Sequence, residues 1–291
     1  MTTVKSVKFN FIMNIILTAS TFIFPLITFP YISRILLPAG VGKVNLATSV
    51  SQYFSMVAMM GVPTYGIRAC AQVRDDRNKL TQTVQEILLL NIMVSVFTYA
   101  VYFLAVWKVP KMHAEAPLYW VMSTTIIFNV IGVEWLYKGL EQYSYITIRS
   151  IVFKVIALVL MFLFVKNQGD YVIYGAISIV AGVGSNILNF INLRKYVDLR
   201  PVRHYQLKRH FKAVAIFFLM AVSTTIYTNL DTVMLGFMQD DVAVGYYSAA
   251  VKVKTLLVSF VTALSAVLLP RASYYIEHDQ KEEFARVSRK A

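Results

Sequence analysis

The sequence has a single cysteine and none of the short motifs that mark nucleotide hydrolysis or metal catalysis. With Cys70 alone, the 291-residue chain forms no intramolecular disulfide and no CxxC metal or redox site. It has no GxxxxGKS/T loop, no HExxH and no GxSxG. These absences argue against ATP-driven transport by this chain alone and against metal-dependent hydrolysis. We therefore expect no cofactor, no metal site and no catalytic residue.

Charge is also scarce, at 15% of residues, whereas 57% are hydrophobic, which leaves too little polar surface for a soluble globule. Apolar runs of about 20 residues recur, the length at which an α-helix crosses a bilayer core. They lack the alternation of a barrel strand. The predicted fold is an all-α polytopic bundle with eight spans, at Phe9–Ile32, Val44–Ile67, Val84–Val106, Leu118–Tyr137, Ile146–Val165, Tyr171–Leu193, Phe211–Phe237 and Gly245–Leu269.

The net charge of +13 is explained by topology rather than by nucleic-acid binding. Most of the 28 lysines and arginines fall in alternate connections between the apolar runs. Because cytoplasmic loops carry an excess of Lys and Arg, this distribution predicts a cytoplasmic N-terminus. The four histidines, His113, His204, His210 and His278, fall in predicted loops or at helix ends, where solvated side chains are expected.

The longest connection, near residues 194–212, contains Pro201 and many basic residues, and it predicts a boundary between two bundles. The expected domains are a first lobe of six spans at residues 1–200, and the start of a second lobe at residues 201–291. The last 19 residues, SYYIEHDQKEEFARVSRKA, resemble an amphipathic segment leading onward, so a fragment or a truncated gene is expected.

Weak internal repetition supports two lobes. The turn after the first span aligns with the turn after the seventh, so that Val41-Gly42 meets Val244-Gly245 and Ala47 meets Ala250. Repeated halves are a common construction of secondary transporters. Within the first span, Pro25 and Pro30 are expected to kink the helix.

Charges inside spans are informative, because a charged side chain at the bilayer centre costs at least about 2.5–3.5 kcal/mol. Asp231 lies near the end of the seventh span, where a cavity, interfacial snorkelling or helix capping would each account for it. Lys252 and Lys254 lie about two turns into the eighth span and, being two residues apart, point in nearly opposite directions. Arg34 can be an interface anchor, and Glu134 an interfacial acid beside an aromatic side chain.

Two acidic pairs could suggest an enzyme, but each has a simpler explanation. Asp75-Asp76 lies among basic residues, where loop ion pairs are expected. Asp240-Asp241 falls in a predicted turn, where acids favour turn geometry and helix starts.

Three stretches carry a family resemblance. NLDTVMLGFMQDDVAVGYYSAA (residues 229–250), EWLYKGLEQYSYITIRSIVFK (134–154) and LLPAGVGKVNLA (36–47) resemble the Wzx-type polysaccharide flippases of the multidrug/oligosaccharidyl-lipid/polysaccharide exporter superfamily. The resemblance implies a bacterial inner-membrane protein of 12 or 14 helices in two lobes. It also implies alternating access that moves undecaprenyl-pyrophosphate-linked oligosaccharide to the outer leaflet for surface polysaccharide synthesis.

On this hypothesis the partners are the lipid-linked oligosaccharide, membrane lipids and polysaccharide assembly proteins, with no nucleic acid. The expected anion contacts are Lys252, Lys254 and Arg34, and the expected sugar or cavity contacts are Tyr53, Tyr227 and Asn229. Asp231 is the expected coupling residue. Two alternatives stay open: a drug or metabolite exporter of the same superfamily, and an integral-membrane enzyme acting on the same lipid carrier.

Overall fold

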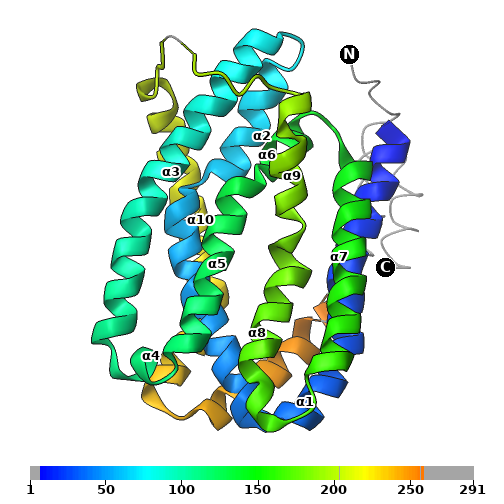
Figure 1. Cartoon of the computed structure of the whole chain (residues 1–291), viewed down its shortest axis with the longest axis vertical. Coiled ribbons are helices and arrows are strands. Elements are labelled where there is room, and N and C mark those ends of the chain that lie inside the picture. The colour runs from blue at the N-terminus through cyan, green and yellow to red at the C-terminus, as the bar shows by residue number, and fades with distance from the viewer. Residues whose placement is uncertain (1–6, 203, 256, 259–291) are drawn as a thin grey trace, which may run out of the picture. The chain divides into compact units, whose positions relative to one another are not determined.

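The computed structural model describes residues 7–202, 204–255 and 257–258, and within these residues every regular element is helical (Figure 1). This confirms the predicted all-α class. The helices are α1 (Val7–Met59), α2 (Val62–Gln72), α3 (Arg77–Lys108), α4 (Pro110–Ala114), α5 (Ala116–Gly132), α6 (Glu134–Gly139), α7 (Tyr143–Phe164), the short η1 (Gln168–Asp170), α8 (Tyr171–Ile179), the π-helical η2 (Val180–Gly184), α9 (Asn186–Asn192), η3 (Leu193–Lys195) and α10 (Lys208–Met238). Residues 241–255 are also helical.

Six stretches of the described chain are long and apolar enough to cross a membrane. They are Phe9–Gln72, Arg77–Lys108, Ala116–Gly139, Tyr143–Phe164, Gln168–Lys195 and Lys208–Met238. The first of them contains both the first and the second predicted span. Each of the first seven predicted spans falls in one of the six, although the fifth extends one residue past its helix, to Val165. The eighth, Gly245–Leu269, lies largely outside the described residues, and the count of eight stays a prediction.

The first predicted span and most of the second lie in the single element α1, which breaks at Leu37, and the second span continues into α2. Leu37 has φ 56° and ψ 175°, outside the helical region, and Pro38 follows it. A residue before proline is driven out of the α conformation, which explains the position of this break. The two legs of α1 meet at the lower end of Figure 1. Pro25 and Pro30 keep helical φ and ψ angles, and the expected kinks at these two residues stay predictions.

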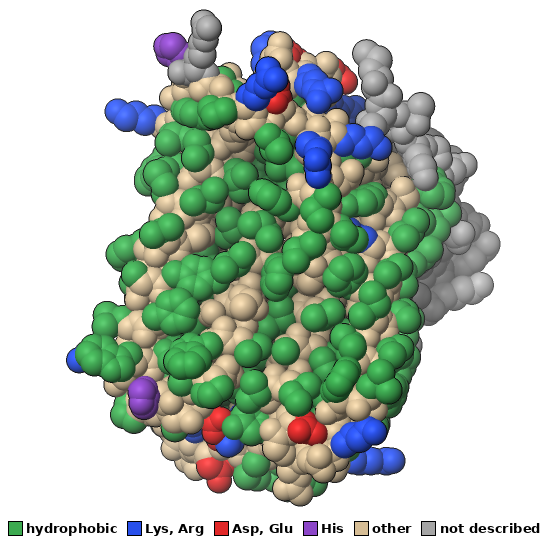
Figure 2. Space-filling model, in the orientation of Figure 1, with side chains coloured by type: hydrophobic (Ala, Val, Ile, Leu, Met, Phe, Trp, Pro, Cys, Tyr) green, Lys and Arg blue, Asp and Glu red, His purple; other side chains and the backbone are tan. Residues whose placement is uncertain are grey.

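The chain divides into two compact units, Met1–Tyr246 and Tyr247–Ala291. In the first unit, α10 packs against α1 and α2, and α5 packs against α1, α3, α8 and α9. Its core includes Trp135, Tyr102, Tyr119 and Tyr137, all almost fully buried. Outward-facing apolar side chains are as expected for contact with lipid: Phe97 is 69% exposed and Leu163 58%. Figure 2 shows such side chains over the middle of one face and charged side chains at its two ends.

The two turns that the sequence aligned with each other are in contact. A Cβ atom on Gly42 would overlap the carbonyl oxygen of Asp241, and one on Gly245 would overlap the carbonyl oxygen of Pro38. Only glycine permits backbones to approach this closely. The glycines of the predicted repeat are thus required at the same packing interface, one from each copy.

Each acidic pair has a structural role. Asp76 forms the expected loop ion pair with Lys79 (3.5 Å), and Asp240 lies at the expected helix start. Asp76 caps α3 by accepting hydrogen bonds from the backbone N–H groups of Asn78 (3.0 Å) and Lys79 (3.1 Å). Asp240 accepts one from the backbone N–H of Ala243 (2.8 Å), at the start of the following helix. The backbone hydrogen bond from Lys79 is the main cause of a lowered pKa for Asp76.

Candidate functional site

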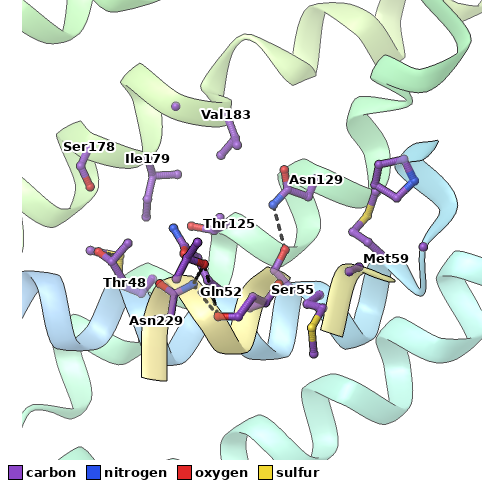
Figure 3. A pocket seen from close by; sticks show the side chains of 18 residues that line it. Thr48, Gln52, Ser55, Met59, Thr125, Asn129, Ser178, Ile179, Val183 and Asn229 are labelled. Carbon is purple, nitrogen blue, oxygen red and sulfur yellow. Dashed lines mark hydrogen bonds between the residues drawn. The ribbon is translucent and has the colours of Figure 1, made fainter. Parts of the chain in front are cut away.

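The first unit contains a cavity of about 510 Å³, here named the neutral cavity. It is lined by the second leg of α1, by α2, α5, α8, η2 and α10. In Figure 3, Ser178, Ile179 and Val183 lie across the cavity from the α1 side chains. The lining residues are Thr48, Gln52, Ser55, Met56, Met59, Gly61, Pro63, Met122, Thr125, Asn129, Ser178, Ile179, Gly182, Val183, Ala221, Thr225, Thr228 and Asn229.

No residue of that lining carries a charge, yet many carry hydroxyl or amide groups. The Asn129 side-chain amide donates to the Ser55 hydroxyl (2.9 Å), which joins α5 to α1 (Figure 3). The Asn229 amide donates to the Thr228 hydroxyl (2.9 Å) and to the Thr225 carbonyl (3.2 Å). Neutral donors and acceptors interspersed with methionine suit an uncharged polar ligand, such as a sugar with several hydroxyl groups.

A second cavity of about 530 Å³, here named the charged cavity, lies between the first leg of α1, α6, α7, α8 and η2. Its polar wall includes Asn14, Thr18, Thr21 and Thr28 from α1. Its charged lining residues are Glu134 and Lys138 from α6 and Lys154 from α7. The Lys154 amine donates to the Ser20 hydroxyl on α1 (2.7 Å).

A network of polar groups fixes one wall of the charged cavity. Arg149, which is 4% exposed, donates to Glu134 (3.0 Å) and to the side chains of Ser185 and Asn186. Lys138 forms a second ion pair with Glu134 (2.8 Å). Buried ions need such partners, because an unpaired one costs several kcal/mol. Glu134 is therefore a member of a cavity-lining ion-pair network, and its expected place at the membrane interface stays a prediction.

The two cavities meet at the junction of α8 and η2. Ser178 and Gly182 line both of them. η2 is a turn of π-helix, a geometry that is frequent at functional sites. A Cβ atom on Gly182 would touch nothing within 4 Å, so this position opens onto empty space. A thin and irregular wall thus separates a neutral compartment from a charged one.

A buried carboxylate joins α10 to α3 at the end of the bundle where α2 and α6 lie. Glu86, whose side chain is fully buried, pairs with Arg209 (2.7 Å) and accepts from the His210 ring (2.7 Å). It also accepts from the Gln206 backbone (2.7 Å), and Tyr65 contacts the other ring nitrogen of His210 (2.5 Å). The expectation that His210 is a solvated side chain is therefore wrong, since it is 2% exposed.

The opposite end of α10 is held by Lys111. Its amine pairs with Asp241 (3.2 Å) and donates to the Gly236 carbonyl. Near it, Lys43 pairs with Glu115 (2.5 Å), which also accepts from the Tyr171 hydroxyl (2.8 Å). Charged groups thus hold the seventh predicted span against the rest of the first unit at both ends.

The structure brings one of the predicted site residues into a cavity. Asn229, 9% exposed, lines the neutral cavity. Tyr53 is half-buried but lies outside both cavity linings, while Tyr227 (82% exposed), Asp231 and Arg34 face outward. Lys252 and Lys254 lie in the second unit. The roles assigned to all seven residues stay predictions.

Sequence reasoning missed Lys154, Arg149 and Glu86. Counting basic residues by alternate connections assigns Lys154 and Arg149 to the connection before the fifth predicted span, although both lie in α7. The available signal was their position: Lys154 falls well inside the predicted span Ile146–Val165. Glu86 gave a weaker signal, because it lies only two residues into its predicted span and looks like an interfacial acid.

The fold and the cavities define a polytopic helical membrane protein with a neutral and a charged compartment side by side. Residues 7–275 match the family described as polysaccharide biosynthesis protein. The chain belongs to this family.

Two relatives are similar over most of the chain. The "Putative O-antigen transporter" of Escherichia coli strain K12 is 23% identical over 270 residues, covering 92% of this chain and 65% of the relative. The protein of the same description from Shigella dysenteriae is 22% identical over 272 residues, covering 91% of this chain and 67% of the relative. The chain thus spans about two thirds of the length of these relatives. No solved structure matches the chain.

Proposed function

We propose that this protein is a flippase that moves an undecaprenyl-pyrophosphate-linked oligosaccharide from the cytoplasmic to the outer leaflet of the bacterial inner membrane by alternating access. The observation that carries the proposal is the pair of adjoining cavities. A lipid-linked oligosaccharide has uncharged sugars beside a negatively charged pyrophosphate. Neither can cross hydrocarbon without a polar path. The neutral cavity suits the sugars, and the charged cavity suits the phosphate.

Family membership and the names of the two relatives support transport for polysaccharide synthesis. A transporter rather than an enzyme is further supported by the acidic pairs, because Asp76 and Asp240 are engaged in helix capping. A cytoplasmic N-terminus is supported by the distribution of Lys and Arg. The partners in this proposal are the lipid-linked oligosaccharide, the surrounding lipids and the enzymes that assemble the polysaccharide.

The test is made in the host strain. Deleting the gene should abolish the surface polysaccharide and leave lipid-linked oligosaccharide accumulated in the cytoplasmic leaflet, and the wild-type gene should restore both. Gln52→Met removes an amide from the neutral cavity. The deletion strain carrying this variant should make about tenfold less polymer than with the wild-type gene, because one hydrogen bond between a sugar and a positioned amide is lost.

The matched control is Gln72→Met, because Gln72 is exposed at the end of α2 and outside both cavity linings. Polymer and protein amounts are measured on the same samples. Unchanged polymer and unchanged leaflet distribution after deletion would contradict the proposed function outright.

A further inference from the structure

Lys154 lies in the middle of α7 (Tyr143–Phe164), half-buried. At a helical rise of about 1.5 Å per residue, it is about 15 Å from either end of the helix. Since the bilayer core is about 30 Å thick, the amine lies near mid-depth. A charge at this depth is costly, so an ionisable residue here indicates a functional site.

Lys154 also stands where two different surfaces meet. It lines the charged cavity, and it lines a separate groove of about 390 Å³ between α1 and α7. The groove walls are apolar, formed by Ile16, Ile23 and Ile27 from α1 and by Val155 and Leu158 from α7. We name this place the α1–α7 seam: the groove, with Lys154 and its partner Ser20 at the inner edge.

The charge of the cavity behind the seam is biased toward cations. Glu134 is its one acidic lining residue, and its carboxylate already bonds Lys138 (2.8 Å) and Arg149 (3.0 Å). The hydrogen bond of Lys154 goes to the neutral hydroxyl of Ser20. Apolar walls that lead to an ammonium group suit a ligand with a hydrocarbon chain and an anionic head.

We propose that the α1–α7 seam binds the polyprenyl carrier lipid, with a phosphate oxygen on the Lys154 amine and the prenyl chain in the groove. This inference rests on the proposed function and assigns the lipid part of the substrate to a particular place. Depth favours the carrier over a resident anionic phospholipid. A phospholipid holds its phosphate at the membrane interface, about 15 Å from Lys154, whereas a lipid in transit must carry its phosphate through mid-depth.

The test is photocrosslinking of the purified protein in mixed micelles with phosphatidylethanolamine. One probe is undecaprenyl diphosphate with a diazirine in its prenyl chain, and the other is phosphatidylglycerol with a diazirine in an acyl chain. The carrier probe should label peptides that contain residues 16–27 or 151–158. Lys154→Gln should reduce this labelling about tenfold, since a charge-assisted hydrogen bond is lost. Lys154→Arg should retain it within about twofold, because the cation is kept.

One further variant separates the groove from the charge. Ala19→Phe should fill the groove, whose wall includes Ala19, and block labelling while Lys154 stays in place. The controls are Ala100→Phe, on the exposed face of α3, and Lys166→Gln, just beyond the end of α7 and exposed. Both should label as the wild type does, which shows that added bulk or lost charge elsewhere has no effect.

Equal labelling of Lys154→Gln and the wild type would overturn the proposal, as would equal labelling of the seam by phosphatidylglycerol. The same variants are introduced into the deletion strain. If Lys154→Gln restores normal polymer where the deletion has none, the proposed function stands and the seam assignment fails. If the deletion itself leaves the polymer intact, the proposed flippase function is contradicted, and the seam assignment, which rests on it, is contradicted as well.

Discussion

The buried carboxylate of Glu86 gives the sharpest test of how α10 is held against the rest of the first unit. Glu86→Gln keeps the shape of the side chain and removes its charge. Arg209 then loses its ion-pair partner, and His210 loses its charged acceptor, although both stay packed against α3. The Gln206 backbone N–H can still donate to the remaining carbonyl oxygen. The change therefore isolates the electrostatic part of this contact.

The loss of unfolding free energy in Glu86→Gln follows from how deeply the ion pair is buried. Breaking a fully buried ion pair by changing one partner costs about 3–5 kcal/mol. Glu86 is fully buried, but the Arg209 side chain is 42% exposed and regains water. We therefore expect a loss of about 2–3 kcal/mol. At about 2–4 °C per kcal/mol for a chain of this size, thermal unfolding should shift down by about 5–10 °C.

The matched control is Glu141→Gln, which breaks the pair between Glu141 and Arg74 (2.7 Å). Their side chains are 35% and 37% exposed, so the expected loss is about 0.5 kcal/mol and the shift about 2 °C or less. Thermal unfolding in detergent is followed together with proteolysis of the connection at residues 196–207. That connection leads directly to Arg209 and His210, the two charged partners of Glu86, so cleavage should accelerate in Glu86→Gln only. Equal shifts for the two variants would refute the burial argument.

Two other outcomes are expected. Replacing Lys252 and Lys254 together by Gln should abolish surface polysaccharide at unchanged protein level, and normal polymer from the double variant would remove both lysines from the mechanism. The lowered pKa of Asp76 means that its cap stabilises α3 above the unfolded pKa of about 3.9 and is lost as pH falls through the lower folded value. Hydrogen exchange at the Asn78 and Lys79 amides should therefore be faster in Asp76→Ala at pH 7 than in the wild type. The difference should disappear in acid, and a difference that persists there would contradict the cap.

The helical spans could be predicted because hydrophobic length is a local property of the sequence. The break of α1 at Leu37 was not predicted. Pro25 and Pro30 leave helical backbone around them, whereas Leu37 before Pro38 adopts φ 56°. A proline removes one hydrogen bond wherever it lies. Whether the chain bends there depends on what the neighbouring helices require, and here Gly42 and Gly245 need the backbones in contact.

The site was harder to predict, because a side chain's direction depends on which neighbouring helix it faces. Asp231 drew attention as a charge near a span end, yet it faces outward on α10, while Asn229 two residues earlier lines the neutral cavity. The positive-inside rule counts basic residues without regard to their depth in the membrane, so it groups Lys154 with the loop charges. The cost of a charge within hydrocarbon rises with its depth, and this cost singles out Lys154 at the middle of α7. Lys154, which the positive-inside rule counts as a loop charge, is therefore the lysine for which burial, depth and a polar cavity together indicate a ligand.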